Sequence, residues 1–306
     1  MCNMVTAQLP IKQGPSPRCA IIFAMLKLAL SLLLVLAGLA SSASPQDDLK
    51  QLVDAERAFA QMAAEQGTRD AFLANMADDA VIFQPDRTLA KPFWTARQRP
   101  AALLSWAPNY ADISSNGVLG YTTGNWEWRA KGKDDQPTAF GDFITIWVRQ
   151  PDGRYKWVVD MGISHAKPEK YSTDWTTTTA KVGDGGAVRS SAADAATEFL
   201  RMIHSRSTVK AYQQYAAADI RLYRDDKMPM LGRKPALAQV AAEKGDLDLA
   251  EKDSFFQAAD VAYSNSTYTR TVNGKIAEQG NYMQVWKLVG GKWQIVLDIF
   301  KPVPQK

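Results

Sequence analysis

Two stretches rich in β-branched and aromatic residues, each interrupted by a short polar turn, predict β-hairpins. The first covers residues 141–162, with turn-forming residues at 150–153. The second covers residues 280–300 and has the same order of residue types, with a turn one residue shorter. A pattern of this length that occurs twice in one chain indicates an internal repeat.

Apolar residues at helical spacing precede each hairpin. Leu52, Ala55, Phe59 and Met62 follow the i, i+3, i+4 pattern and predict an amphipathic helix that begins near residue 47. A second helix, a strand over 80–83, a short helix after Pro100 and a strand over 121–129 are predicted next. This order, with the hairpin strands taken as antiparallel, predicts an α+β domain.

The repeat sets the predicted domain boundaries. Phe199 matches Phe59, and the offset of 140 (199 − 59) holds over many positions that follow. We therefore expect a first domain over 47–162 and a second domain over 195–306. Residues 163–194 are rich in Ser, Thr and Gly without a period, which predicts a polar linker.

The first 43 residues predict a secretory signal peptide. Lys27 introduces an apolar run over 26–39, and small residues follow up to Ala43, where we expect cleavage. Met25 is a better start than Met1, which indicates a misassigned start codon. The alternative is an uncleaved anchor, although the apolar run is short for a membrane span. We expect an exported, periplasmic protein with no stable membrane span after cleavage.

Charge and cysteine content limit the kinds of binding and catalytic chemistry that we expect. The formal charge of +4 falls to about +1 (4 − 3) when the three basic residues of the signal peptide are removed, which gives no basis for nucleic-acid binding. Cys2 and Cys19 both lie in the removable segment, so we expect no disulfide and no thiol nucleophile. The two histidines, His165 and His204, are too few for a structural zinc site. No metal and no cofactor are expected.

Three segments carry a resemblance to a known superfamily. They are the ADDAVIF segment (77–83), the LGYTTGNWEW strand (119–128) and the hairpin that begins with GDF and ends with WVVDMG. The chain resembles, twice in tandem, the SnoaL-like or nuclear transport factor 2-like superfamily, in the bacterial branch of domains of unknown function. The resemblance implies two cone-shaped α+β domains, each a curved antiparallel sheet wrapped by helices around a conical cavity.

The superfamily includes ketosteroid isomerases, polyketide cyclases, dehydratases, epoxide hydrolases and non-catalytic members, so the fold alone does not select a function. Single-domain members usually dimerise. The resemblance therefore implies an intramolecular pseudo-dimer of the two domains, or a homo-oligomer.

Two carboxylates are the catalytic candidates. Asp160 and Asp298 end an apolar strand at the same place in both repeats, and Asp142 has Asn281 as its counterpart. A desolvated aspartate can act as a general base, and a shared aspartate can equally fix a strand end. Asp142 and Asp160 remain candidates with both roles open. Superfamily dehydratases use a His–Asp pair inside the cone, and His165 is predicted beyond the strand end, outside that pattern.

Aromatic residues in the first domain are the ligand-binding candidates: Trp94, Trp106, Tyr110, Tyr121, Trp126 and Trp128. Trp126 and Trp128 share one face of a predicted strand. An aromatic wall suits a flat apolar ligand, and core packing is the alternative explanation.

The leading hypothesis is an exported small-molecule-binding or accessory protein. The alternatives are an isomerase-like or cyclase-like acid–base enzyme that uses an aspartate of the first cone, and a structural protein-interaction module. Whether the protein is an enzyme stays open. An open cone with a buried ionisable carboxylate favours the enzyme, whereas a filled cone excludes the first two hypotheses and favours the third.

Overall fold

The computed structural model describes residues 44–98, 101–172, 174–178 and 190–304. The predicted signal peptide lies outside these residues. Among the helices that the structure describes, none is long and apolar enough to span a membrane.

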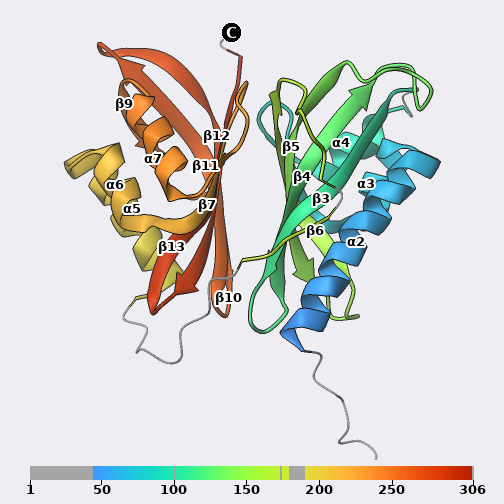
Figure 1. The fold of residues 1–306 in the computed structure, drawn as a ribbon, viewed down its shortest axis with the longest axis horizontal. Helices are drawn as coiled ribbons and strands as arrows, with labels where there is room; N and C mark the ends of the chain where they lie inside the picture. Colours follow the sequence, from blue (N-terminus) through green and yellow to red (C-terminus); the bar gives the residue numbers. More distant parts are fainter. Residues whose placement is uncertain (1–43, 99–100, 173, 179–189, 305–306) are drawn as a thin grey trace, which may run out of the picture. The chain divides into compact units, whose positions relative to one another are not determined.

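The first half of the described chain is one six-stranded sheet with three helices on one face (Figure 1). Its helices are α2 (Pro45–Gln66), α3 (Thr68–Asn75) and α4 (Ala90–Ala96). Its strands are β1 (Met76–Phe83), β2 (Arg87–Leu89), β3 (Leu103–Ile113), β4 (Leu119–Arg129), β5 (Ala139–Arg149) and β6 (Tyr155–His165). The strand order is β2-β1-β6-β5-β4-β3.

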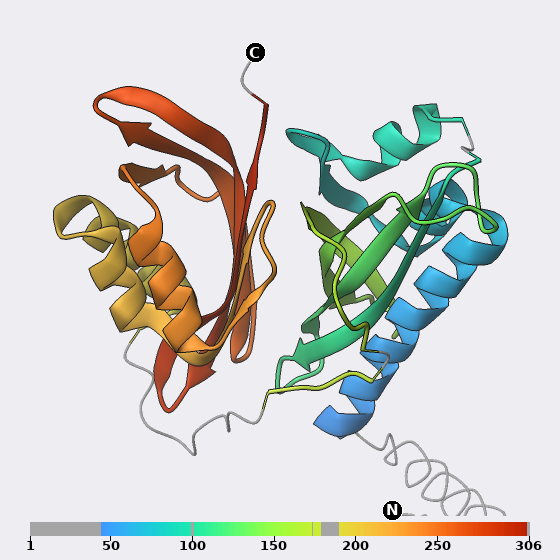
Figure 2. The ribbon, with the colours of Figure 1, turned by 45° about the horizontal axis from the view of Figure 1, so that its top comes forward.

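The second half has its own sheet and three helices, which cover one face of that sheet (Figure 2). The helices are α5 (Ala192–Ser205), α6 (Thr208–Tyr215) and α7 (Arg233–Ala242). The strands are β7 (Ala216–Arg224), β8 (Met230–Leu231), β9 (Asp246–Leu249), β10 (Ser254–Ala258), β11 (Val261–Val272), β12 (Lys275–Val289) and β13 (Lys292–Pro302). Read from β8, the order is β8-β7-β13-β12-β11-β10, and β9 also pairs with β11.

Local sequence explains where the long helices begin. Ser44 accepts a hydrogen bond from the Asp47 amide, and the Asp47 carboxylate accepts one from the Ser44 amide, which forms a capping box. Ser191 and Asp194 form the same reciprocal pair at the start of α5. Each box satisfies amides that have no partner within the helix.

Several predicted elements differ from the observed ones. The sheets are mixed, because β1 pairs with β6 in parallel and β7 pairs with β13 in parallel. β1 begins at Met76, four residues earlier than predicted, since pairing of Met76 with Trp157 extends it. The helix near Pro100 is instead α4, and Leu103 begins the strand β3. His165 belongs to β6, where it pairs with Phe140.

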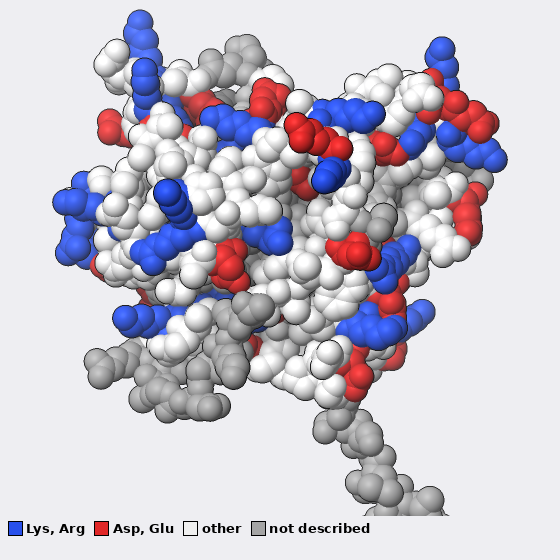
Figure 3. All heavy atoms as spheres, viewed as in Figure 1, with Lys and Arg blue, Asp and Glu red and all other residues white. Residues whose placement is uncertain are grey.

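Surface and buried charged pairs differ in how much they contribute to stability. Basic and acidic side chains are interspersed over the face in Figure 3. Exposed pairs such as Lys50–Asp54 contribute little to stability. A buried pair favours the one arrangement in which its two charges meet, because water cannot stabilise a buried charged group that has lost its partner.

One buried ion pair joins the two halves. Lys287 Nζ lies 2.6 Å from both carboxylate oxygens of Asp112, and both residues are 3% exposed. Around them, apolar residues of β1, β4, β5 and β6 form one continuous core with the second half. Nearby, Thr123 Oγ1 lies 3.0 Å from the Tyr223 hydroxyl. These polar contacts specify one register between the faces.

Replacement of Lys287 by Met is expected to lower the free energy of unfolding by about 3–5 kcal/mol, because it leaves the buried Asp112 carboxylate unpaired. The double variant Asp112→Leu/Lys287→Met should lose less of the free energy of unfolding than the single variant, since it removes both charges. Urea denaturation of both variants measures the difference. A single variant as stable as the double would contradict this account of the pair.

Candidate functional site

A cavity of about 780 Å³ opens between the helices and the sheet of the first half. Its walls are mainly aromatic: Phe59, Phe72, Phe83, Phe93, Trp94, Trp106, Trp126, Trp128 and Phe143. The polar lining residues are Thr68, Gln84, Arg97, Gln98, Asp160 and Ser164 of the first half and Lys301 of β13. Volume and lining are those of a small-molecule site.

Asp160 is the carboxylate of this cavity. It is partly exposed and lines the cavity wall. Its Oδ2 accepts a hydrogen bond of 3.0 Å from Thr145 Oγ1, on the neighbouring strand β5. Desolvation raises the pKa of Asp160 to about 6, although the Thr145 hydrogen bond and the charge of Lys301 oppose that rise. Asp160 can therefore exchange a proton near neutral pH.

Lys301 enters the same cavity from the second half of the chain. Its Nζ donates a 2.8 Å hydrogen bond to the carbonyl oxygen of Gly162, a residue that also lines the cavity. Desolvation lowers the pKa of Lys301, while the charges of Asp225 and Asp160 act against that change. Sequence reasoning did not identify this residue.

Glu56 of α2 is a second ionisable group, buried behind the aromatic wall. Its carboxyl accepts hydrogen bonds from Trp106 Nε1 at 2.6 Å, Thr122 Oγ1 at 2.5 Å and Trp147 Nε1 at 3.1 Å. Complete burial raises its pKa to about 7, against the effect of these donors. Because Trp106 lines the cavity, Glu56 positions part of the wall.

Of the predicted ligand-binding residues, Trp94, Trp106, Trp126 and Trp128 line the cavity. Tyr110 and Tyr121 do not. They are buried in the core shared with the second half, with ring centroids 6.0 Å apart. A register shift in β3 between Pro108 and Tyr110 turns Tyr110 to the face opposite Trp106. Tyr121 lies on that face because side chains alternate along β4.

Asp142 also lies away from the cavity. Its Oδ2 is 2.8 Å from His165 Nε2, and its Oδ1 accepts a 3.0 Å hydrogen bond from Asn125 Nδ2. His165 is buried, and its hydrogen bonds to Asp142 and the Ala166 carbonyl raise its pKa despite that burial. The chain does contain a close His–Asp pair. Neither residue lines the cavity.

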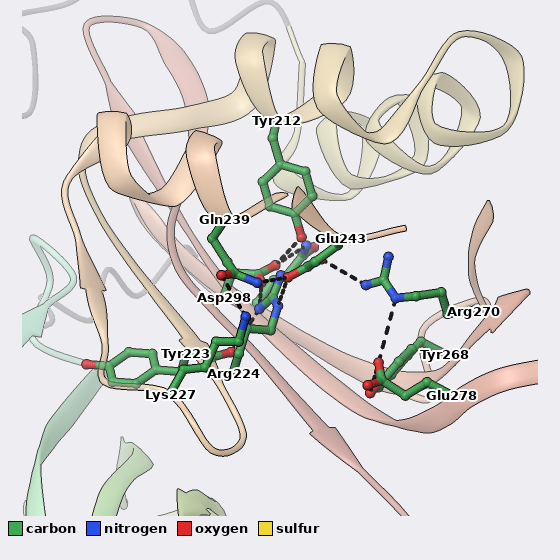
Figure 4. A network of polar contacts seen from close by, with 11 residues as sticks. Tyr212, Tyr223, Arg224, Lys227, Gln239, Glu243, Tyr268, Arg270, Glu278 and Asp298 are labelled. Atoms are coloured by element: carbon green, nitrogen blue, oxygen red, sulfur yellow. Dashed lines mark hydrogen bonds and ion pairs between the residues drawn. The ribbon is translucent and has the colours of Figure 1, made fainter. Parts of the chain in front are cut away.

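The second half has a different interior (Figure 4). Asp298 is fully buried and accepts hydrogen bonds from Tyr212 Oη at 2.8 Å, Arg224 Nη1 at 2.7 Å and Gln284 Nε2 at 2.8 Å. Arg224 also pairs with Glu243, at 2.8 Å. The hollow beside this network measures about 240 Å³.

Residues at matched positions explain the difference between the interiors. Trp126 pairs with Gly141 in the first sheet, as Tyr268 pairs with Gly280 in the second. The same register matches Trp128 with Arg270 and Ala139 with Glu278. The offset of 140 matches Phe72 with Tyr212 and Gln84 with Arg224, and the offset of 138 between Asp160 and Asp298 matches Gly162 with Phe300. At these positions the second half has three charged side chains (Arg224, Arg270 and Glu278) and the bulky Phe300, whereas none of the five first-half residues is charged. The cavity of the first half, about 780 Å³, is correspondingly larger than the hollow of about 240 Å³ in the second.

The described side chains include no group of three or more His, Cys, Asp or Glu residues arranged to hold a metal ion.

Comparison with known proteins yields only distant similarities. No protein-family model matches the chain, and no curated protein matches it. Among solved structures, an NTF2-like protein of unknown function from Shewanella oneidensis MR-1 is 15% identical, with a TM-score of 0.31, and the match covers 35% of this chain and 96% of that one. A ketosteroid isomerase-like protein from Erwinia carotovora atroseptica SCRI1043 is 16% identical with the same TM-score, covering 37% and 93%. An NTF2-like protein of unknown function from Pseudomonas putida KT2440 is 15% identical, again with a TM-score of 0.31, covering 37% and 84%.

Glu56 is expected to make stability depend on pH. Its pKa is about 7 in the folded protein and near 4.5 when exposed, so folding favours the protonated form. Below pH 4.5 the Glu56 carboxyl group is protonated in both the folded and the unfolded protein, so its burial does not lower the free energy of unfolding. As the pH rises through 7, the free energy of unfolding should fall by about 3 kcal/mol, at 1.36 kcal/mol per pKa unit.

Urea denaturation from pH 4.5 to 8 measures this loss. Glu56→Gln should lose stability less steeply than the wild type, because glutamine does not titrate and only the contribution of other groups with a raised pKa, such as Asp160, remains. Glu65→Gln, an exposed position on the same helix, should behave as the wild type. The same pH slope in Glu56→Gln and wild type would rule out this assignment.

Proposed function

We propose that the first half of this protein binds a small, flat, largely apolar molecule in its cavity. The observation that carries the proposal is the cavity of about 780 Å³, with aromatic walls and one partly exposed carboxyl group. Ligand sites in proteins are typically about 300–1,000 Å³, apolar, and equipped with a few polar groups that fix orientation. Aromatic rings favour a planar ligand through offset stacking and edge contacts.

We further propose that the chain is a tandem of two SnoaL-like cones, over 47–162 and 195–306, with a linker over 163–194. The support is the common strand order of the two sheets and the parallel pairing of the first long strand with the last in each. The buried contacts between the halves support an intramolecular pseudo-dimer. Export to the periplasm rests on the sequence of residues 1–43 alone.

Acid–base catalysis in the same cavity is a second candidate function. The specific observation in its favour is Asp160, whose pKa of about 6 suits a general base at neutral pH. Asp142 is a weaker candidate, since its carboxylate is held by His165 and Asn125 outside the cavity.

Replacement of Gly162 by Phe tests the binding site. Phe300 fills the matched position of the second half, and a Cβ at Gly162 would lie 3.1 Å from the Asp142 carbonyl oxygen, so a small adjustment admits a side chain. We expect Gly162→Phe to weaken binding of the neutral fluorescent probe N-phenyl-1-naphthylamine by at least about tenfold, because the ring occupies the cavity.

Gly162→Ala, which adds only a methyl group, is the matched control and should bind the probe nearly as well as the wild type. Unchanged thermal unfolding of both variants would show that the fold persists. Probe binding that survives Gly162→Phe would contradict the proposed site.

The enzyme hypothesis is tested by the isomerisation of a β,γ-unsaturated cyclic ketone, followed by the absorbance of the conjugated product. If Asp160 is the base, the rate should rise with pH through an apparent pKa of about 6, because only the carboxylate accepts a proton. Asp160→Asn should lower kcat by at least about 100-fold, while Asp142→Asn should not. Equal rates in Asp160→Asn and wild type would exclude this role.

A further inference from the structure

We infer that the cavity is a composite site in which Lys301 of the second half and Asp160 of the first together hold one hydroxyl group of a planar aromatic ligand. This inference rests on the proposed binding function and specifies the ligand class. The two halves would then have different tasks, since the first provides the apolar walls and the second provides the ammonium group.

Lys301 faces away from the interior of the second half because of its position on β13. Side chains alternate along a strand, so Asp298 and Phe300 point into the interior of the second half while Lys301 points the opposite way. Its Nζ reaches the Gly162 carbonyl oxygen at 2.8 Å. A lysine ammonium has three N–H donors, and this hydrogen bond uses one of them.

Neighbouring contacts fix this edge of the two halves. The Asp226 amide donates to the Ser164 carbonyl oxygen at 2.8 Å, and the Ser164 amide donates to Asp225 Oδ1 at 2.8 Å. Asn281 Nδ2 donates to the Pro85 carbonyl oxygen at 2.9 Å. Lys301 is therefore held at the cavity by the same contacts that join β6 to the second half.

The remaining bonding capacity of the two groups selects the ligand chemistry. Among the described residues, Asp160 accepts a side-chain hydrogen bond from Thr145 only, and the Lys301 ammonium bonds to the Gly162 carbonyl oxygen without a direct ion pair to Asp160. A carboxylate needs a donor and an ammonium needs an acceptor. A hydroxyl group supplies both. A ligand carboxylate would repel Asp160, and a ligand amine would repel Lys301.

The matched residues show that Lys301 is particular to the second half. Asp160 and Asp298 are matched at an offset of 138 (298 − 160). At this offset the residue of the first half that corresponds to Lys301 is Ile163, which is buried in the core. The interior of the second half is meanwhile occupied by Phe300 and the network of Arg224 and Asp298. The second half thus presents a charged group to the cavity of the first, while its own hollow is smaller, at about 240 Å³.

Two probes of one ring system separate this inference from the proposed function. Calorimetry with 2-naphthol and 2-methylnaphthalene compares a hydroxyl group with a methyl group on the same apolar ring. In the wild type we expect both to bind, and 2-naphthol to bind about tenfold more tightly, because its hydroxyl group hydrogen-bonds to charged groups.

Lys301→Met keeps the length of the side chain and removes its charge. We expect it to bind 2-methylnaphthalene as the wild type does and to lose most of the preference for 2-naphthol. Lys292→Met, at an exposed position on the same strand, is the matched control and should keep the preference. Asp160→Asn is a second variant that does not depend on the contact between the halves, and it should lose the preference too.

The outcomes are distinct. Binding of neither probe to the wild type would overturn the proposed function and the inference with it. Equal binding of both probes would overturn the inference and leave the apolar site standing. A preference that survives Lys301→Met in a folded protein would remove Lys301 from the site.

Discussion

Each half of this protein places a carboxylate at the same position on its last strand, and the arrangement of each interior follows from how that charge is accommodated. Desolvating a carboxylate is costly unless donors surround it. In the second half, Asp298 has three donors, one of which is the guanidinium of Arg224. In the first half, Asp160 accepts a side-chain hydrogen bond from Thr145 among the described residues, and it lines the cavity. The carboxylate with three donors is enclosed by its partners, and the one with a single donor lines the cavity.

The substitutions that separate the halves act together. Arg224 depends on partners such as Glu243 and Asp298, because an unpaired buried guanidinium is expensive, whereas the matched Gln84 is exposed and needs no such partner. The ion-pair network of the second half is therefore one unit, and so is the aromatic wall of the first. Glu56 belongs to that wall, since it accepts hydrogen bonds from two tryptophans. Its matched residue is Ala196, by the offset of 140.

The contacts between the halves are polar as well as apolar, and this mixture has a consequence for the site. An apolar interface alone would tolerate sliding, whereas the pair of Asp112 and Lys287 is favourable in one register only. That register places the end of β13 beside Gly162 of β6. The cavity of one half is thereby coupled to the position of the other.

Local sequence patterns were enough to predict the elements that form without distant contacts. Helical spacing around Phe59 predicted α2, and the two hairpins followed from β-rich runs flanking turn residues. Strand alternation placed Trp126 and Trp128 on one face, which is the cavity face. A charged residue inside the apolar stripe of α2 was a visible signal for Glu56.

The tertiary structure decided what depends on long-range pairing. The extension of β1, the shift in β3 that separates Tyr110 from Trp106, and the entry of Lys301 each arise from segments far apart in the chain. Local pattern contains no information about such contacts, because a bulge of one residue reverses every face that follows it. The elements were therefore predictable from the sequence, whereas the composition of the site required the assembled structure.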